Sequence, residues 1–89
     1  MIRNENFVIR KIGTQYAIVA VGEATKRFNG MISVNKTGSF IWETLKNECT
    51  METLVAAITD HYEVDAATAK KDAETFVTAL KGVGAIEGD

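Results

Sequence analysis

Residues 28–43 read FNGMISVNKTGSFIWE, and two kinds of secondary structure meet inside this stretch, near Asn35. Residues 30–34 have the apolar and β-branched composition of a strand. The apolar residues after Asn35 recur at helix spacing, and asparagine is favoured immediately before a helix. We therefore expect a strand over residues 30–34 that leads directly into a helix over residues 36–47, with Gly38 serving close packing.

The segment before this junction predicts a hairpin. Residues 7–12 and 15–21 are rich in β-branched and aromatic residues, and a Gly-Thr pair separates them. Both faces of the second strand are apolar, which is typical of a central strand. Residues 22–25 then indicate a turn, and residues 26–28 leave room for a short extension of the third strand.

The segment after the junction predicts two further helices. Thr50 caps a helix over residues 51–62, and Asp65 caps a helix over residues 66–82, where apolar residues recur with a period close to 3.6. Two glycines end this last helix. The expected fold class is α+β: one winged-helix-like domain over residues 1–89, with a three-stranded antiparallel sheet followed by three helices on one face of it.

Length and charge exclude several classes of protein. The chain has 89 residues, which is enough for one domain. Ten Lys and Arg residues against twelve Asp and Glu residues leave a net charge of −2, so nucleic acid is a poor partner. No apolar run approaches the roughly 18 residues that span a membrane, and the N-terminus does not read as a signal peptide. We therefore expect a cytoplasmic protein with no membrane partner.

No set of residues in the sequence predicts catalysis. The one histidine, His61, ends the second predicted helix, and the one cysteine, Cys49, lies in a loop without a basic neighbour. Asp60, Glu63 and Asp65 straddle a short loop, whereas a calcium site needs a longer loop with more ligands. We therefore expect no enzyme activity, no metal site and no cofactor.

The third strand carries no charge, which makes it the candidate interaction element. Residues 30–34 contain neither lysine nor proline, the residues that commonly protect an exposed strand edge. If the strand lies at an edge, it can recruit an extended peptide, which gains affinity from backbone pairing and specificity from side-chain pockets. If it is central, or covered by the third helix, it cannot. The residues alone leave these two interpretations even.

A second line of evidence comes from residues 34–43, VNKTGSFIWE, which resemble the Asn-x-x-Gly-x-x-Ile-Trp-Glu signature of PqqD-like proteins. The downstream pattern agrees, with YEVD at residues 62–65, a long helix, and a Gly-Ala-Ile close at residues 84–86. The similarity covers nearly the whole chain. The motif residues that we interpret as structural, serving as cap, close contact and core, are Asn35, Gly38, Ile41 and Trp42.

The resemblance implies a peptide chaperone, the recognition element used in making ribosomally synthesised and post-translationally modified peptides. Such proteins share the winged-helix-like order of elements and have no catalytic activity. The leader of a precursor peptide adds to the third strand and lies against the third helix, and the domain presents it to a modifying enzyme, often a radical S-adenosylmethionine protein. On this chain the peptide-binding residues would be Met31, Ile32, Ser33 and Val34 on the strand, with Ala69, Lys70, Asp72, Ala73 and Phe76 as candidates for the groove wall.

Two alternatives and the pathway stay open. Lys70 and Lys71 could begin the recognition helix of a winged-helix DNA-binding regulator, although Asp72 and Glu74 beside them weaken contact with phosphates. The uncharged third strand could instead pair with a second copy of the chain in a homodimer. Residues 21–29 fall outside the signature of members that make the cofactor pyrroloquinoline quinone, so the resemblance assigns the family and not the pathway.

Overall fold

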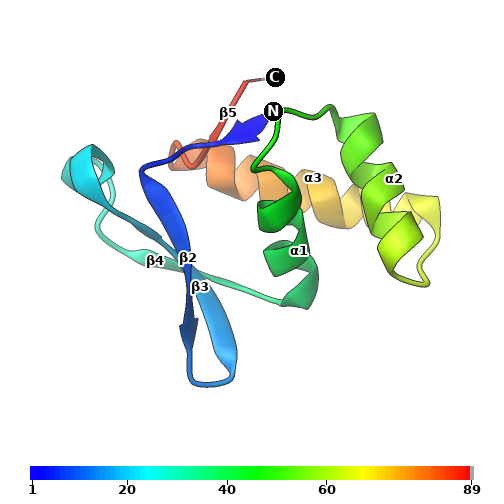
Figure 1. Ribbon diagram of the computed structural model, residues 1–89, viewed down its shortest axis with the longest axis horizontal. Coiled ribbons are helices and arrows are strands. Elements are labelled where there is room, and N and C mark those ends of the chain that lie inside the picture. Colours follow the sequence, from blue (N-terminus) through cyan, green and yellow to red (C-terminus); the bar gives the residue numbers. More distant parts are fainter. Residues whose placement is uncertain (89) are drawn as a thin grey trace.

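The computed structural model describes residues 1–88 and has the expected α+β class. A three-stranded antiparallel sheet in the order β2-β3-β4 is followed along the chain by three helices (Figure 1). The elements are β1 (Ile2–Arg3), β2 (Phe7–Ile12), β3 (Gln15–Ala20), the 3-10 helix η1 (Gly22–Lys26), β4 (Met31–Val34), α1 (Lys36–Thr44), α2 (Met51–His61), α3 (Ala66–Gly82) and β5 (Ile86–Glu87).

The position of β3 at the centre of the sheet agrees with its two apolar faces. The β2–β3 hairpin turns at Gly13, whose φ of 64° suits the first central position of a two-residue hairpin loop. Among the described residues, β4 pairs with β3 alone, with Ile32 opposite Ile18 and Val34 opposite Tyr16. β4 is therefore an edge strand and not a central one, whereas the sequence left both positions open.

Side chains cap all three α-helices at the expected residues. Asn35 Oδ1 accepts a hydrogen bond from the Gly38 backbone N–H at 2.8 Å. Thr50 Oγ1 accepts from Thr53 at 3.1 Å, and Asp65 Oδ1 accepts from Thr68 at 2.7 Å. Each cap satisfies one of the N–H groups that have no partner inside the helix. The three caps thereby fix where the chain enters each helix.

The core joins the sheet to all three helices. Trp42 is only 1% exposed and lies among the fully buried side chains, as expected for a packing centre. The other large side chains that are almost completely buried are Ile18, Ile41, Leu45, Leu54, Ile58 and Leu80. Within residues 1–88, no helix is both long enough and apolar enough to cross a membrane.

A second, two-stranded sheet was not predicted from the sequence. β1 pairs antiparallel with β5, with Ile2 opposite Glu87, so the two ends of the described chain lie side by side (Figure 1). Strands of two residues are too short to show the alternation that identifies a strand. The Arg3 N–H donates to the carbonyl of Leu45 at 2.9 Å. α1 ends at Thr44, three residues before the predicted end at residue 47.

The connection from β3 to β4 also differs from the expectation. Residues 22–26 form the 3-10 helix η1 instead of a simple turn, beginning at Gly22 with a φ of 59°. The Thr25 hydroxyl donates to the Gly22 carbonyl at 2.7 Å, which tightens the turn. The extension of the third strand over residues 26–28 is therefore wrong, because this segment completes η1 and then leads to Met31.

Candidate functional site

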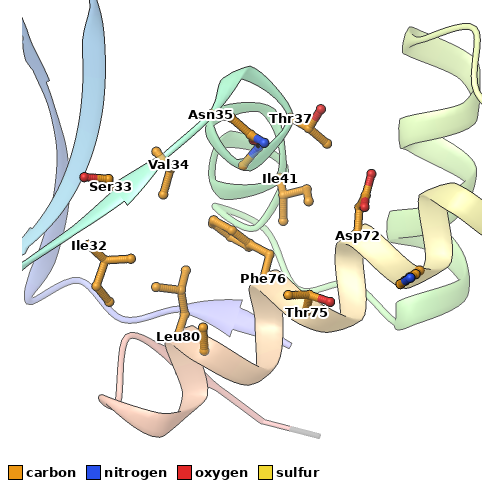
Figure 2. A pocket seen from close by; sticks show the side chains of 13 residues that line it. Ile32, Ser33, Val34, Asn35, Thr37, Ile41, Asp72, Thr75, Phe76 and Leu80 are labelled. Carbon is orange, nitrogen blue, oxygen red and sulfur yellow. Dashed lines mark hydrogen bonds between the residues drawn. The ribbon is translucent and has the colours of Figure 1, made fainter.

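A groove lies between the edge strand β4 and helix α3, with residues at the start of α1 between them (Figure 2). Its volume is about 310 Å³. The lining residues come from three elements: Ile32, Ser33 and Val34 from β4, Lys71, Asp72, Thr75, Phe76, Ala79 and Leu80 from α3, and Asn35, Thr37, Gly38 and Ile41 from α1 and its cap.

The groove is apolar inside and polar along part of its rim. Figure 2 shows Ile32, Phe76 and Leu80 directed toward the same space. Leu80 is fully buried, whereas Ile32 and Phe76 are half-buried and keep part of their apolar surface accessible. Lys71 and Asp72 are exposed where α3 passes the start of α1. Such a surface accepts apolar side chains inside and polar groups at the rim.

The phase of the β-ladder determines which backbone groups of β4 are free. Beyond the end of the hairpin, the Val21 N–H donates to the Asn6 carbonyl at 2.7 Å. Facing residues in an antiparallel pair alternate between exchanging hydrogen bonds and directing their backbone groups away from each other. Carried along the register through β3, this alternation directs the N–H and C=O groups of Met31 and Ser33 away from β3.

No other part of the described chain occupies these groups. Among residues 1–88, the backbone hydrogen bonds outside the ladders and helices do not reach Met31 or Ser33. An edge residue that directs its backbone outward can pair with an added strand. The free edge of β4 therefore offers two residues for pairing, and Ser33 also lines the groove.

Gly38 lets α1 approach α3 at the base of the groove. A Cβ atom at this position would lie 2.9 Å from Phe76 Cε1 and 3.1 Å from Val34 Cβ. Both distances are shorter than the roughly 3.5–4.0 Å of ordinary carbon–carbon contacts. The close packing predicted for this glycine is confirmed.

The groove contains some of the residues expected from the sequence and not others. Ile32, Ser33, Val34, Asp72 and Phe76 line it. Met31 belongs to the same strand, but its side chain is 58% exposed and does not line the groove.

The remaining candidates on α3 lie elsewhere. Lys70 is exposed outside the groove lining, and Ala69 and Ala73 are both 0% exposed in the core. The side chains of these two alanines are therefore not accessible to a ligand in this structure.

Thr75 and Ala79 line the groove but were not predicted from the sequence, and the helical period counted from Phe76 identifies them. Ala69, Ala73, Val77 and Leu80 form the buried stripe of α3. Asp72, Thr75, Phe76 and Ala79 lie on the neighbouring stripe, at spacings of three and four residues, and they face the groove. Counting from Phe76 with this spacing would have identified Thr75 and Ala79 and set aside the two alanines of the core.

The chemically reactive side chains serve other roles. His61 stacks on Phe40, with ring centroids 4.3 Å apart, at the end of α2. Burial raises the pKa of the Cys49 thiol, which disfavours the nucleophilic thiolate. In the part of the chain that the structure describes, no three His, Cys, Asp or Glu side chains are grouped to hold a metal ion.

Two solved structures share this fold. One, described as "TbiB1 in Complex with the TbiA(beta) Leader Peptide", has 25% sequence identity and a TM-score of 0.75, over 100% of this chain and 98% of that chain. The other, described as "Lasso peptide synthetase B1 complexed with the leader peptide", has 20% identity and a TM-score of 0.68, over 92% of this chain and 91% of that chain. The second likeness concerns the fold alone.

The sequence profile of a known family also matches most of the chain. Residues 14–86 match the family described as "Coenzyme PQQ synthesis protein D (PqqD)". No curated protein sequence matches the chain. The matched segment includes β4, α1 and α3, and therefore every element that lines the groove. With its fold and its sequence in agreement, the chain belongs to the PqqD family.

Proposed function

We propose that this protein binds the leader of a precursor peptide as an additional strand on β4 and presents it to a separate modifying enzyme. The observation that carries the proposal is the uncharged edge of β4, with the backbone groups of Met31 and Ser33 directed outward beside an apolar groove. The two solved structures with this fold are described as complexes with leader peptides.

An added strand fits both chemical features of this edge. Its backbone would pair with the outward-directed groups of Met31 and Ser33, at the spacing of about 4.8 Å that separates neighbouring strands in a sheet. Because successive side chains of a strand point to opposite faces, every second side chain of the leader would enter the groove. There it would meet Ile32, Phe76 and Ala79, while Lys71 and Asp72 would contact polar groups at the rim.

The proposed binding residues refine the set expected from the sequence. Met31, Ile32, Ser33 and Val34 contribute as a strand, and Asp72 and Phe76 contribute from α3. Lys71, Thr75 and Ala79 join them, and the buried Leu80 supports the floor of the groove. Lys70 is exposed but does not line the groove, and Ala69 and Ala73 pack in the core, so these three residues are not in the proposed set.

The protein would hold the peptide and leave the chemistry to its partner. We propose a single domain over the whole chain, acting in the cytoplasm, with a radical S-adenosylmethionine protein as the partner enzyme. The DNA-binding alternative has no support, since Asp72 and Glu74 are exposed beside Lys70 and Lys71 on α3.

Titration by NMR tests the proposal directly. The probe is a synthetic peptide with the leader sequence of the precursor gene beside the gene for this protein, added to ¹⁵N-labelled protein. We expect the largest amide shifts in residues 31–34 and on the stripe of α3 that contains Thr75 and Ala79. Binding without shifts in either segment would contradict strand addition on β4.

A separate measurement tests the homodimer alternative. A second copy on β4 would occupy the same edge as the leader. Light scattering on the free protein, over a range of concentrations, measures the oligomeric state. A stable dimer whose interface maps to residues 31–34, and which the leader does not dissociate, would contradict the proposal.

A further inference from the structure

The contact between Gly38 and Phe76 lies in the wall of the groove. Phe76 is half-buried, and its ring edge rests where a side chain at position 38 would be. We propose that Gly38 sets the depth of the groove, because the missing side chain lets the Phe76 ring lie against α1 and leaves the space above it open for an apolar leader side chain. This inference rests on the proposed function and assigns a specificity-determining role to a residue outside the strand.

The surroundings of Gly38 decide which atoms would move if a side chain were added. Val34 Cβ would lie 3.1 Å from the new Cβ, so β4 limits movement on that side. Retreat of α1 is opposed by Ile41 and Trp42, which are each 1% exposed in the core. Val34 and Phe76 are both half-buried, but the Val34 contact is at Cβ, which the backbone of β4 holds in place, whereas the Phe76 contacts are at ring atoms that can move by side-chain rotation.

The direction of that movement leads into the groove. The new Cβ would lie 2.9 Å from Phe76 Cε1 and 3.2 Å from Phe76 Cδ1, so the ring edge must move by several tenths of an ångström at least. Ile32 and Leu80 border the open space next to the ring (Figure 2). A ring displaced into this space would take the volume that the leader side chain needs.

Four variants separate this effect from general damage: Gly38→Ala, Phe76→Leu, the double variant, and Gly82→Ala as a control. Gly82 is the last residue of α3, it has no heavy atom within 4 Å of an added Cβ, and its φ is not positive. The probe is the same synthetic leader peptide, here labelled with fluorescein. Anisotropy gives the Kd, and circular dichroism with thermal melting confirms folding.

We expect Gly38→Ala to weaken binding about tenfold or more in the Phe76 background. In the Phe76→Leu background, where the shorter side chain removes the conflict, the same substitution should weaken binding by no more than about twofold. Gly82→Ala should bind as the wild-type protein does. An unchanged Kd for Gly38→Ala, or an equal loss in both backgrounds, would overturn the inference.

Two further readouts keep the result decisive. If Gly38→Ala does not fold, a folded double variant supports the conflict with Phe76, and an unfolded double variant overturns it. A crystal structure of peptide-free Gly38→Ala, compared with the wild-type protein, reports the position of the Phe76 ring without any ligand. If the wild-type protein does not bind the leader, the proposed function fails, while the ring position still tests the conflict.

Discussion

The two edges of the three-stranded sheet differ in charge and in what lies beside them. The β2 edge carries Arg10 and Lys11, both exposed, and charged residues at an edge discourage pairing with another strand. β4 has no charged residue and faces α3 across the apolar groove. The tip of the β2–β3 hairpin instead projects away from the helices (Figure 1). One sheet therefore combines a protected edge with an edge suited to pairing.

Blocking the groove beside β4 should give the largest loss of leader binding among these predictions. Ala79 is exposed on α3 and lines the groove, so Ala79→Arg would place a long charged side chain at the proposed leader site. We expect binding of the labelled leader, measured by anisotropy, to fall about 100-fold or more. Stability should change by no more than about 0.5 kcal/mol, because an exposed helix position tolerates arginine.

The neighbouring residue supplies the control for this block. Thr78 is exposed on the same turn of α3 but does not line the groove. Thr78→Arg adds the same charge to the same helix and should bind within about twofold of the wild-type protein. If both arginine variants lose affinity equally, the effect is one of net charge and the groove is not the binding site.

Proline at each edge compares the two backbones directly. The phase of the ladder directs the N–H of Ser33 outward on β4 and the N–H of Lys11 outward on β2. Ser33→Pro should weaken leader binding about two- to tenfold, the value of one backbone hydrogen bond of about 0.5–1.5 kcal/mol. Lys11→Pro should leave the Kd unchanged, because the proposed site lies at the opposite edge of the sheet.

A third proline variant, Ile32→Pro, tests through its stability which backbone groups of β4 face β3. Ile32 directs its backbone toward β3, so Ile32→Pro would remove a bond within the sheet and should lower the melting temperature more than Ser33→Pro does. Thermal unfolding of the three variants, followed by circular dichroism, measures this order. Equal destabilisation by Ser33→Pro and Ile32→Pro would show that the assigned phase of the ladder is wrong.

The sequence was sufficient for the elements whose determinants are local. Asn35, Thr50 and Asp65 each cap the expected helix, because a cap depends on one side chain and an N–H three residues away. The alternation in β3 and the helical period in α3 likewise act within one element. These local patterns were enough to predict the α+β class and the order of the strands and helices.

Features that depend on contacts between distant segments were not accessible in this way. β1 and β5 pair residues from opposite ends of the described chain, and neither strand is long enough to show a pattern. Consecutive residues of a helix are rotated by about 100°, so the buried stripe and the groove stripe of α3 are neighbours on its surface. A small error in the facing of the helix was therefore enough to assign Ala69 and Ala73 to the groove. Gly38 could be assigned to close packing, but its partner Phe76 follows 38 residues later in the chain and is identified by the fold.

Acid should affect the first turn of α3, the helix whose later turns line the groove, more than the β2 edge, with the smallest effect of the series. Asp65 caps α3, and the hydrogen bond from the Thr68 N–H holds the pKa of this carboxyl below its ordinary value. A carboxyl whose pKa is lower in the folded state stabilises that state above the unfolded pKa and loses this contribution as the pH falls through the folded pKa. The first turn of α3 should therefore loosen below about pH 4.

Comparison with Asp65→Asn makes the acid effect specific. Asparagine is an equally good cap but does not titrate in this range, so the variant should keep the first turn of α3 through the same pH change. The measurement is the amide shift of Thr68, against those of the β2–β3 hairpin, from about pH 6 to about pH 2. The effect should be modest because Asp65 is exposed and water screens its charge. An identical titration of Thr68 in Asp65→Asn would exclude the cap as its cause, and equal shifts in the hairpin would show that acid does not distinguish the first turn of α3 from the β2 edge.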